Sequence, residues 1–194
     1  EPSKHKPRFI AMWRQIASRF KGYDKEKLFF ELLNEPQDNL TMEKWNPMVK
    51  ETIAAIREID KEHTIIITGT DWGKATGLKG LKIPQGETRI IVTFHFYSPF
   101  NFTHQGASWV KPSPPMGTKW PGTAVKAACK AIRDELDLAK AWSEAHGKIP
   151  VFMGEFGAYS TADIASRVKW TAYVRKQAEL RGFSWAYWEF CSGF

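Results

Sequence analysis

The sequence predicts an α/β fold built around a parallel sheet. Short apolar runs typical of strands alternate with amphipathic helical segments about every 40 residues, and no linker or low-complexity stretch interrupts them. Alternation of this kind gives parallel strands joined by right-handed crossovers. The chain has 194 residues, 43% of them hydrophobic and 25% charged, which is enough for one domain with a sizeable core. We therefore expect a single domain over residues 1–194.

The helices follow from apolar spacing and end signals. Apolar residues recur at helical spacing from Pro7 to Phe20, and Gly22 is a C-terminal stop, so this segment is predicted to be a helix that packs on the sheet. A second helix is predicted to run to residue 60, with Asn46 as its cap and Pro47 in its first turn. The remaining helices are expected over about residues 123–146 and from Thr161 or Asp163 to residues 181–182.

Five strands are predicted, over residues 28–34, 64–70, 89–97, 149–155 and 183–188. The first and fourth are short, apolar and bounded by Pro or Gly, a pattern typical of strands buried on both faces. Each leads to a carboxylate, Glu35 or Glu155. Alternation along a strand places Glu35 on one face with Glu31 and Leu33, and Glu155 on one face with Met153. We expect Glu35 and Glu155 to enter one space.

The third strand also ends on polar side chains, because alternation places His95 and Tyr97 on one face near its carboxyl end. A loop over residues 98–122 follows, rich in proline and aromatic residues. It is longer than ordinary connections, and such loops are commonly functional. Polar and aromatic residues therefore collect at carboxyl ends of strands, where the chemistry of parallel α/β proteins is found.

Composition excludes several classes of function. The net charge is +7 with a pI near 9.4, but the basic residues are dispersed without a basic run or reader motif, which favours a solvated surface over nucleic-acid binding. No apolar run approaches the roughly 18 residues of a membrane span. Cys129 and Cys191 lack metal-ligand spacing, and the sequence leaves open whether they pair.

Two segments resemble a known family. Asn34-Glu35-Pro36 and Gly154-Glu155-Phe156-Gly157, in this order and with the intervening strands, are similar to the two catalytic-glutamate segments of glycoside hydrolase family 5. The resemblance implies a partial (β/α)8 TIM barrel, with five parallel strands that correspond to strands four to eight and a single incomplete catalytic domain over residues 1–194. The first three strands of the family barrel, which supply an arginine near the nucleophile and a histidine in the sugar site, have no counterpart here.

The resemblance also implies roles for individual residues. A retaining glycosidase needs one carboxyl group as acid/base and a second, about 5 Å away, as nucleophile. Glu35 matches the acid/base and Glu155 the nucleophile; buried ion pairs are the structural alternative. Asn34 matches the residue that binds the sugar hydroxyl beside the anomeric carbon, although a turn or capping function is open. His95 and Tyr97 match a pair in which the tyrosine hydroxyl holds the nucleophile, whereas a strand histidine taken alone is more often a core residue.

Several aromatic residues are candidates for sugar binding. Trp188 ends the last strand, where the resemblance implies a platform on which a sugar ring stacks. Trp72, Trp109 and Trp120 lie in loops after strands, and each is expected either to bind substrate or to cover the core. Glu31 lies deeper than Glu35 and is expected to be a buried, paired structural carboxylate.

The implied function is a retaining endo-β-1,4-glucanase (cellulase) that acts on β-glucan polysaccharide or oligosaccharide without metal or organic cofactor. It is expected to be secreted, cell-surface or periplasmic. Alternatives are a β-mannanase or xylanase of the same family and a catalytically impaired carbohydrate-binding fragment. Because five strands leave two apolar sheet edges, we also expect a partner, either an N-terminal barrel fragment or a second copy of the chain.

Overall fold

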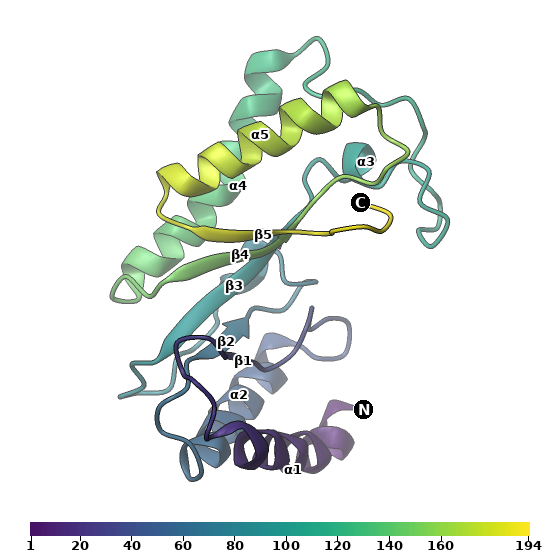
Figure 1. Cartoon of the computed structure of the whole chain (residues 1–194). Helices are drawn as coiled ribbons and strands as arrows, with labels where there is room; N and C mark the ends of the chain where they lie inside the picture. The colour runs from purple at the N-terminus through teal and green to yellow at the C-terminus, as the bar shows by residue number, and fades with distance from the viewer. The chain divides into compact units, whose positions relative to one another are not determined.

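A computed structural model describes all residues from 1 to 194 (Figure 1). The elements are α1 (Pro2–Phe20), β1 (Phe30–Glu31), α2 (Met42–Arg57), β2 (Ile65–Thr68), the 3-10 helix η1 (Ala75–Leu78), β3 (Ile90–Phe96), α3 (Phe100–Thr103), α4 (Val125–Ala145), β4 (Val151–Phe156), α5 (Ile164–Leu180) and β5 (Ser184–Tyr187). The strand order is β1-β2-β3-β4-β5. None of these helices combines the length and apolar character needed to cross a membrane.

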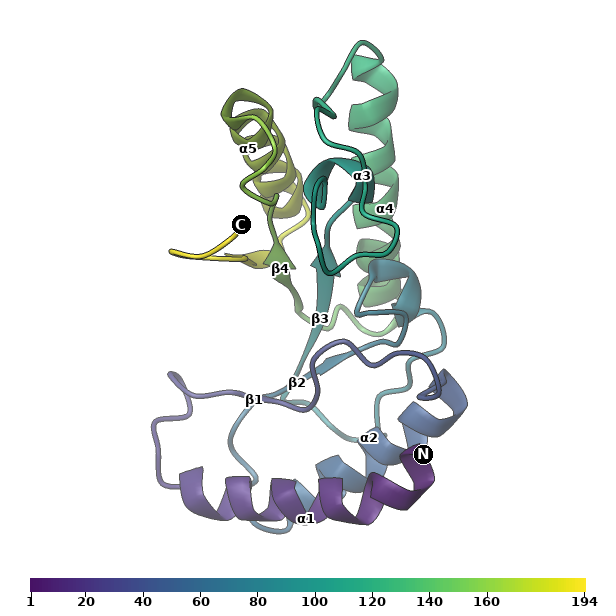
Figure 2. The same cartoon turned by 90° about the vertical axis from the view of Figure 1, so that its right-hand side faces the viewer.

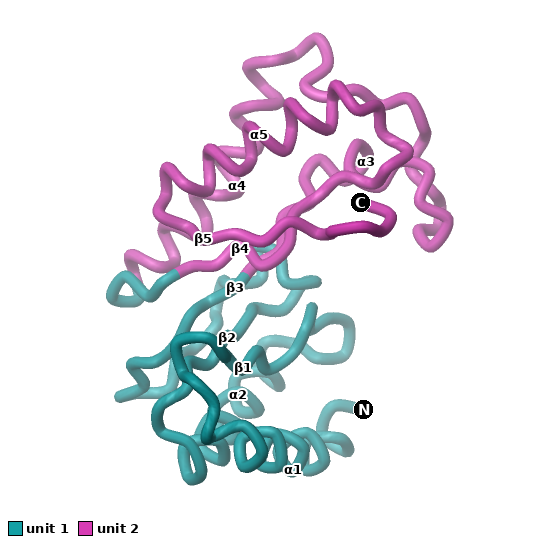
Figure 3. The backbone as a smooth tube through the Cα atoms, viewed as in Figure 1, with its two compact units in different colours: residues 1–93, 146–150 teal, residues 94–145, 151–194 magenta.

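The backbone divides into two compact units, which Figure 3 shows in teal and magenta. Unit 1 comprises Glu1–Thr93 and His146–Pro150, and unit 2 comprises Phe94–Ala145 and Val151–Phe194. Strand β3 begins in unit 1 and ends in unit 2. The single domain expected from sequence stays a prediction.

In unit 1, two helices cover a parallel sheet. Strand β1 pairs with β2, and β2 pairs with β3 in a register that runs from Ile65 opposite Ile90 to Thr68 opposite Thr93. Helices α1 and α2 lie side by side in both views (Figures 1 and 2). Strand β2 consists of isoleucines followed by Thr68, and all of its residues are buried, as expected for a parallel strand covered on both faces.

Two buried tryptophans attach the helices of unit 1 to the ends of its strands. The indole of Trp13 on α1 donates to the Leu32 carbonyl at 3.2 Å, just after β1, and that of Trp45 on α2 donates to the Thr68 carbonyl at 2.8 Å, at the end of β2. Each ring buries a large apolar area, while its N–H donates to a backbone carbonyl at or just beyond the end of a strand. The carboxyl ends of both strands are therefore hydrogen-bonded to helices that pack against the sheet.

Unit 2 is organised around Trp170 of α5, which is fully buried. Its ring stacks on Phe96 of β3 at 6.1 Å between centroids and also meets Phe102 and Phe156. Strands β4 and β5 are parallel, with Phe152 opposite Ser184. Helices α4 and α5 are neighbours (Figure 2). The hydrophobic core of unit 2 thus joins the three strands to α5.

The predicted pattern of helices and strands is confirmed, with shifted ends. Of the two caps expected for α5, Asp163 is the one observed, since its carboxylate accepts from the Ser166 amide at 3.0 Å. The prediction that Asn46 caps α2 is wrong, because the helix begins a turn earlier, after Thr41. The Asn46 side chain instead binds a loop, donating to the Gly80 carbonyl and accepting from the Lys82 amide, both at 2.9 Å, and Pro47 lies inside the helix.

The first strand is shorter than predicted and buried on only one face. Only Phe30 and Glu31 form β1, and Phe30 is buried whereas Phe29 and Glu31 are exposed. The prediction of a buried Glu31 is therefore wrong. The physical reason is that only one face of this segment is covered: Phe30 and Leu32 are buried on that face, where Trp13 of α1 packs against Phe30, and Glu31 points to the other face.

Candidate active site

Glu155 lies at an irregularity in β4. The pairing with β5 advances three residues on β4, from Met153 to Phe156, against two on β5, from Trp185 to Tyr187, which is the count of a β-bulge. Met153 and Phe156 are both buried, and Glu155 between them is only half-buried. The prediction that Glu155 shares a face with Met153 is thus wrong, because the bulge moves Phe156 onto the buried face and turns Glu155 away from it.

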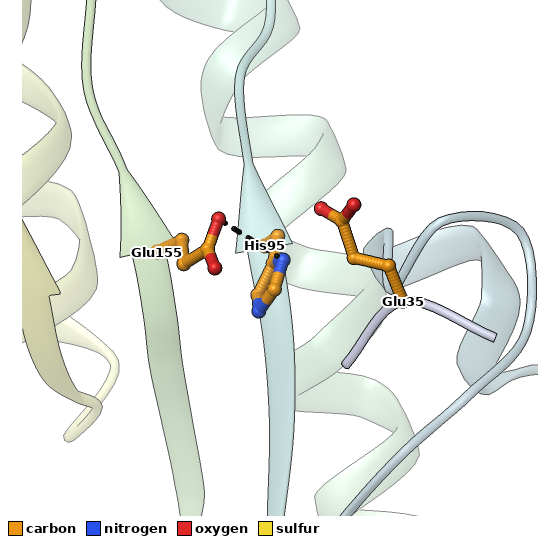
Figure 4. Close-up of side chains that lie close together, drawn as sticks. All are labelled: Glu35, His95 and Glu155. Atoms are coloured by element: carbon orange, nitrogen blue, oxygen red, sulfur yellow. Dashed lines mark ion pairs between the residues drawn. The ribbon is translucent and has the colours of Figure 1, made fainter. Parts of the chain in front are cut away.

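Two side chains from the end of β3 hold the Glu155 carboxylate. The Tyr97 hydroxyl donates to Oε2 of Glu155 at 2.8 Å, and Nδ1 of His95 lies 3.4 Å from the same oxygen. Figure 4 shows the imidazole beside this carboxylate, with the ion pair dashed. His95 is buried and Glu155 keeps 16% of its side chain exposed, so the carboxylate has a fixed orientation but remains accessible.

Both partners of Glu155 can act as hydrogen-bond donors to the same oxygen. The phenolic O–H of Tyr97 occupies one acceptor site of the Glu155 carboxylate and leaves other lone pairs of the carboxylate available. An imidazole beside the same oxygen adds a second potential donor. One oxygen of the Glu155 carboxylate is thus oriented by groups from the end of β3.

Gly157 allows the last strand to approach the Glu155 segment. A Cβ at Gly157 would lie 1.9 Å from the carbonyl oxygen of Trp188, and the Trp188 amide donates to the Phe156 carbonyl at 2.9 Å. Any side chain at position 157 would push this backbone away. Trp188 itself leaves 43% of its surface exposed, as a sugar platform requires. The glycine two residues after Glu155 therefore brings the Trp188 backbone next to the Glu155 segment.

Trp109 belongs to an aromatic cluster of unit 2. Its ring contacts Tyr159 edge-on at 4.9 Å, His104 at 6.5 Å and Phe194 at 6.3 Å, and 56% of its surface is exposed. The core-covering alternative for Trp109 therefore does not hold. Tyr159 and Phe194 were not singled out from the sequence, since they lie 50 and 85 residues after Trp109 and form no local pattern with it.

In unit 1, Glu35 is set by the backbone. Glu35 has a φ of +43°, the left-handed region that costs a non-glycine residue energy and is found most often at functional sites. It therefore lies beyond the strand, and alternation does not extend to it. Asn34 before it is exposed and Pro36 after it is buried. Figure 4 draws Glu35 on this non-strand segment.

A turn after β2 presents Trp72 close to the Glu35 segment. Asp71, Trp72 and Gly73 all have positive φ, and the Asp71 carboxylate fixes the turn by accepting from the Thr76 hydroxyl at 2.8 Å. The Trp72 amide donates to the Pro36 carbonyl at 3.3 Å, and its side chain is 49% exposed. Trp72 is therefore displayed at the surface rather than used to cover the core.

The sequence candidates thus fall into two groups. Glu155, His95, Tyr97, Trp109 and Trp188 all belong to unit 2, and the first three are in direct contact. Asn34, Glu35 and Trp72 belong to unit 1. Trp120 is buried against Tyr173 at 5.5 Å and is a core residue, so the platform alternative for it is wrong. Cys129 and Cys191 are both free.

Comparison with known proteins identifies the family. Residues 2–193 match the model of the cellulase family, glycosyl hydrolase family 5. Endoglucanase H of Acetivibrio thermocellus is 36% identical over 94% of this chain and 18% of its own length, and endoglucanase C of that species is 30% identical over 96% and 61%. Crystal structures of Cel5A from Thermotoga maritima, in complex with cellobiose and with mannotriose, are 49% identical with TM-scores of 0.94, covering 100% of this chain and 62% of theirs.

The chain therefore spans less than two thirds of the length of these relatives. Their structures confirm the predicted fold class, an α/β fold with five parallel strands of a TIM barrel. The motifs that carried the resemblance, Asn34-Glu35-Pro36 and Gly154-Glu155-Phe156-Gly157, lie within the matched residues. The chain belongs to glycosyl hydrolase family 5, the cellulase family.

Proposed function

We propose that this chain carries the catalytic carboxylates of a retaining endo-β-1,4-glucanase. The observation that supports it most is the Glu155 carboxylate, held through one oxygen by the Tyr97 hydroxyl at 2.8 Å with His95 beside it. A nucleophile must be accessible and fixed in orientation, because reaction with the anomeric carbon depends on alignment. The same reaction class is supported by the names of two relatives reported above, endoglucanase H and endoglucanase C.

In the proposed mechanism, the Glu35 carboxylic acid donates its proton to the glycosidic oxygen while the carbon–oxygen bond to the leaving sugar breaks. The Glu155 carboxylate forms a bond to the anomeric carbon on the opposite face, giving a glycosyl ester. The Glu35 carboxylate then takes a proton from water, whose oxygen displaces Glu155 and restores both groups. Two inversions at one carbon give overall retention.

Tyr97 is a positioning residue in this mechanism. Its hydroxyl occupies one oxygen of Glu155 and so directs which oxygen meets the sugar. The exposed indoles of Trp188, Trp109 and Trp72 are proposed to stack on sugar rings, whose C–H faces are apolar. Asn34, exposed directly before Glu35, is proposed to bind the hydroxyl beside the anomeric carbon.

Trapping of the glycosyl ester tests the proposal. A 2-deoxy-2-fluoro-cellobioside with an activated leaving group forms the ester and releases it slowly, because fluorine destabilises both oxocarbenium-like transition states. The intact mass should rise by one fluorocellobiosyl group, and peptide mapping should place it on Glu155. An adduct on another residue, or product of inverted configuration without an adduct, would refute the proposal.

A second candidate is action on β-mannan, favoured by the mannotriose complex of a structure 49% identical to this chain. The same two carboxylates serve several sugars, and loops around the site decide which. Release of reducing ends from β-1,4-glucan, β-mannan and xylan distinguishes these substrates. Quenching of tryptophan fluorescence by cello-oligosaccharide without any product would instead favour the binding-fragment alternative.

We also propose that the edge strands of each unit have a partner. Strand β1 lies at one end of the strand order and β5 at the other, with Phe29 and Trp185 exposed beside them. The partner is either a further barrel segment or a second copy of the chain. Light scattering gives the mass in solution, and a monodisperse 22.2 kDa species would contradict both forms of the proposal. For the proposed glucanase we also propose a secreted, cell-surface or periplasmic location, where polymeric glucan is found.

A further inference from the structure

The backbone that carries Tyr97 is held by two buried side-chain donors. Strand β3 ends at Phe96, so the carbonyl groups of the next two residues need hydrogen-bond donors from outside the sheet. The Thr103 hydroxyl donates to the Tyr97 carbonyl at 2.6 Å, and the Trp170 indole donates to the Ser98 carbonyl at 3.0 Å. Thr103 and Trp170 are both fully buried. Two successive peptide groups are therefore fixed from within unit 2.

The other contacts of Thr103 determine the direction of its hydroxyl proton. Nδ1 of His104 lies 3.0 Å from the Thr103 hydroxyl oxygen, and the Phe100 carbonyl lies 3.4 Å away. A hydroxyl has one proton, and the shortest contact, to the Tyr97 carbonyl, receives it. The remaining contact then fits the His104 tautomer with its proton on Nδ1, which donates to the Thr103 hydroxyl oxygen. The result is a chain of hydrogen bonds from His104 through Thr103 to the Tyr97 backbone.

Thr103 also joins the strand end to the segment that follows Glu155. The Tyr159 amide, four residues after Glu155, donates to the Thr103 carbonyl at 2.8 Å. The His104 ring, whose Nδ1 contacts Thr103, packs edge-on against the Tyr97 ring at 5.1 Å. Thr103 thus contacts the Tyr97 backbone, the residue beside the Tyr97 ring and the chain after Glu155.

These contacts matter because the Tyr97 hydroxyl lies at the far end of the ring from its backbone. A small rotation of the Tyr97 peptide moves the hydroxyl through a larger distance, and its 2.8 Å bond to Glu155 tolerates little displacement. We propose that Thr103 is a positioning residue for the glycosidase reaction, acting through the Tyr97 backbone on the Tyr97–Glu155 hydrogen bond. The inference rests on the proposed function, in which Glu155 is the nucleophile.

Paired substitutions test whether the hydroxyl is what matters. Thr103→Val keeps the shape and removes the donor, and Thr103→Ser keeps the donor. We expect Thr103→Val to lower kcat about tenfold with KM changed less than twofold, since misplaced groups cost rate rather than ground-state binding, and Thr103→Ser to stay within about threefold of the unmodified chain. The control is Thr118→Val, which removes a hydroxyl that donates to the Pro115 carbonyl in the loop after α3 and has no recorded contact with Tyr97. It should leave kcat unchanged.

A double-mutant cycle separates positioning from general loss of structure. If Thr103 acts through the Tyr97 hydroxyl, then Thr103→Val should have little further effect once Tyr97→Phe has removed that hydroxyl. Fully additive losses would overturn the inference. If Thr103→Val loses its cooperative thermal transition, Thr103→Ala takes its place in the same cycle.

A spectroscopic measurement decides the inference without turnover. The chain has five tyrosines, so a sample labelled with ¹³C at the tyrosine ring carbon that bears oxygen gives five signals, and Tyr97→Phe identifies the one from Tyr97. We expect Thr103→Val to shift this signal while Thr118→Val does not. A Tyr97 signal that stays in place in Thr103→Val would overturn the inference.

Failure of the inference can be told apart from failure of the proposed function. If Glu155→Ala retains activity, the proposed function fails, whatever Thr103 does. If Glu155→Ala and Tyr97→Phe both lose activity while Thr103→Val matches the Thr118→Val control, the function stands and only the inference about Thr103 is wrong.

Discussion

The two units hold their glutamates in different ways. Glu155 in unit 2 is fixed through its side chain, by Tyr97 and His95 on the neighbouring strand. Glu35 in unit 1 is set by its backbone, with a φ of +43° after a strand of two residues. A nucleophile needs one oxygen aimed at carbon throughout, whereas an acid/base must change its protonation state twice per turnover. The comparison shows one carboxylate oriented by side chains of a neighbouring segment, and one presented by a residue in a left-handed backbone conformation.

Removal of either glutamate should have the largest effect. Glu155→Ala and Glu35→Gln are each expected to lower kcat by at least about 10²-fold, since each group performs a chemical step in the proposed mechanism. The thermal transition should be unchanged or slightly raised, because neither side chain belongs to the hydrophobic core. Initial rates on a soluble β-1,4-glucan and circular dichroism melts measure the two effects. A variant that keeps more than about a tenth of the rate would remove that glutamate from the mechanism.

Tyr97→Phe should weaken only the side-chain restraint on Glu155 in unit 2. It deletes the hydroxyl that donates to Glu155 and keeps the ring that packs on His104. We expect kcat to fall about 10- to 100-fold with a small change in KM, because orientation rather than substrate binding is lost. Tyr23→Phe, at an exposed tyrosine of unit 1, is the matched control. Equal rates for the two variants would show that the Glu155 contact is not used.

Trp188→Ala should act on substrate binding as well as on rate. The exposed indole offers a stacking face, so its loss removes binding energy from the ground state and the transition state together. We expect KM to rise and kcat/KM to fall about tenfold, while Trp188→Phe recovers part of both because it keeps a flat ring. An unchanged KM in Trp188→Ala would mean that this tryptophan is only structural.

The smallest expected effect is on the stability of the fold at low pH, and it concerns an ion pair in unit 1. Burial acts to raise the pKa of Glu87, but the guanidinium of Arg57, which binds both carboxylate oxygens at 2.9 and 3.1 Å, holds that pKa below its usual 4.5. Because this pKa is lowered in the folded state, the ionised Glu87 stabilises the protein above the usual value of 4.5, and the stabilisation is lost as the pH falls through the folded-state pKa.

We therefore expect Glu87→Gln to lower the melting temperature by a few degrees at pH 7 and by much less at pH 3, since about 1 kcal/mol shifts the transition by 2–4 °C in a chain of this size. Hydrogen exchange at each pH would place the change in unit 1. A melting-temperature difference independent of pH would show that packing, not charge, is responsible.

Sequence patterns located the elements well but not the geometry at their ends. Long apolar periodicities such as that of α1 and the alternating run of β3 predicted their structures, because periodicity reports which face is buried. The pattern failed for Glu31, since only one face of its segment is covered, and for the face of Glu155, since a bulge breaks the period of two. Neither an uncovered face nor a bulge leaves a mark in local composition.

Candidate residues showed the same contrast. The motifs around Glu35 and Glu155, and the position of Tyr97 two residues after His95, could be read because each lies at a predicted strand end. Thr103 could not, because its importance comes from a contact with a carbonyl and not from its residue type. The aromatic loop also gave no means to separate exposed Trp109 from buried Trp120, which differ only in tertiary packing.

Rescue by azide tests the division of roles between Glu35 and Glu155 most directly. In Glu155→Ala, azide can take the place of the missing nucleophile and attack the anomeric carbon once, so the account predicts an α-glycosyl azide from a β-glucoside with an activated leaving group. In Glu35→Ala, azide attacks the ester already formed on Glu155, so the account predicts a β-glycosyl azide. Proton NMR of the anomeric centre reads both products, and the reverse assignment, or azide products of one configuration from both variants, would contradict the account.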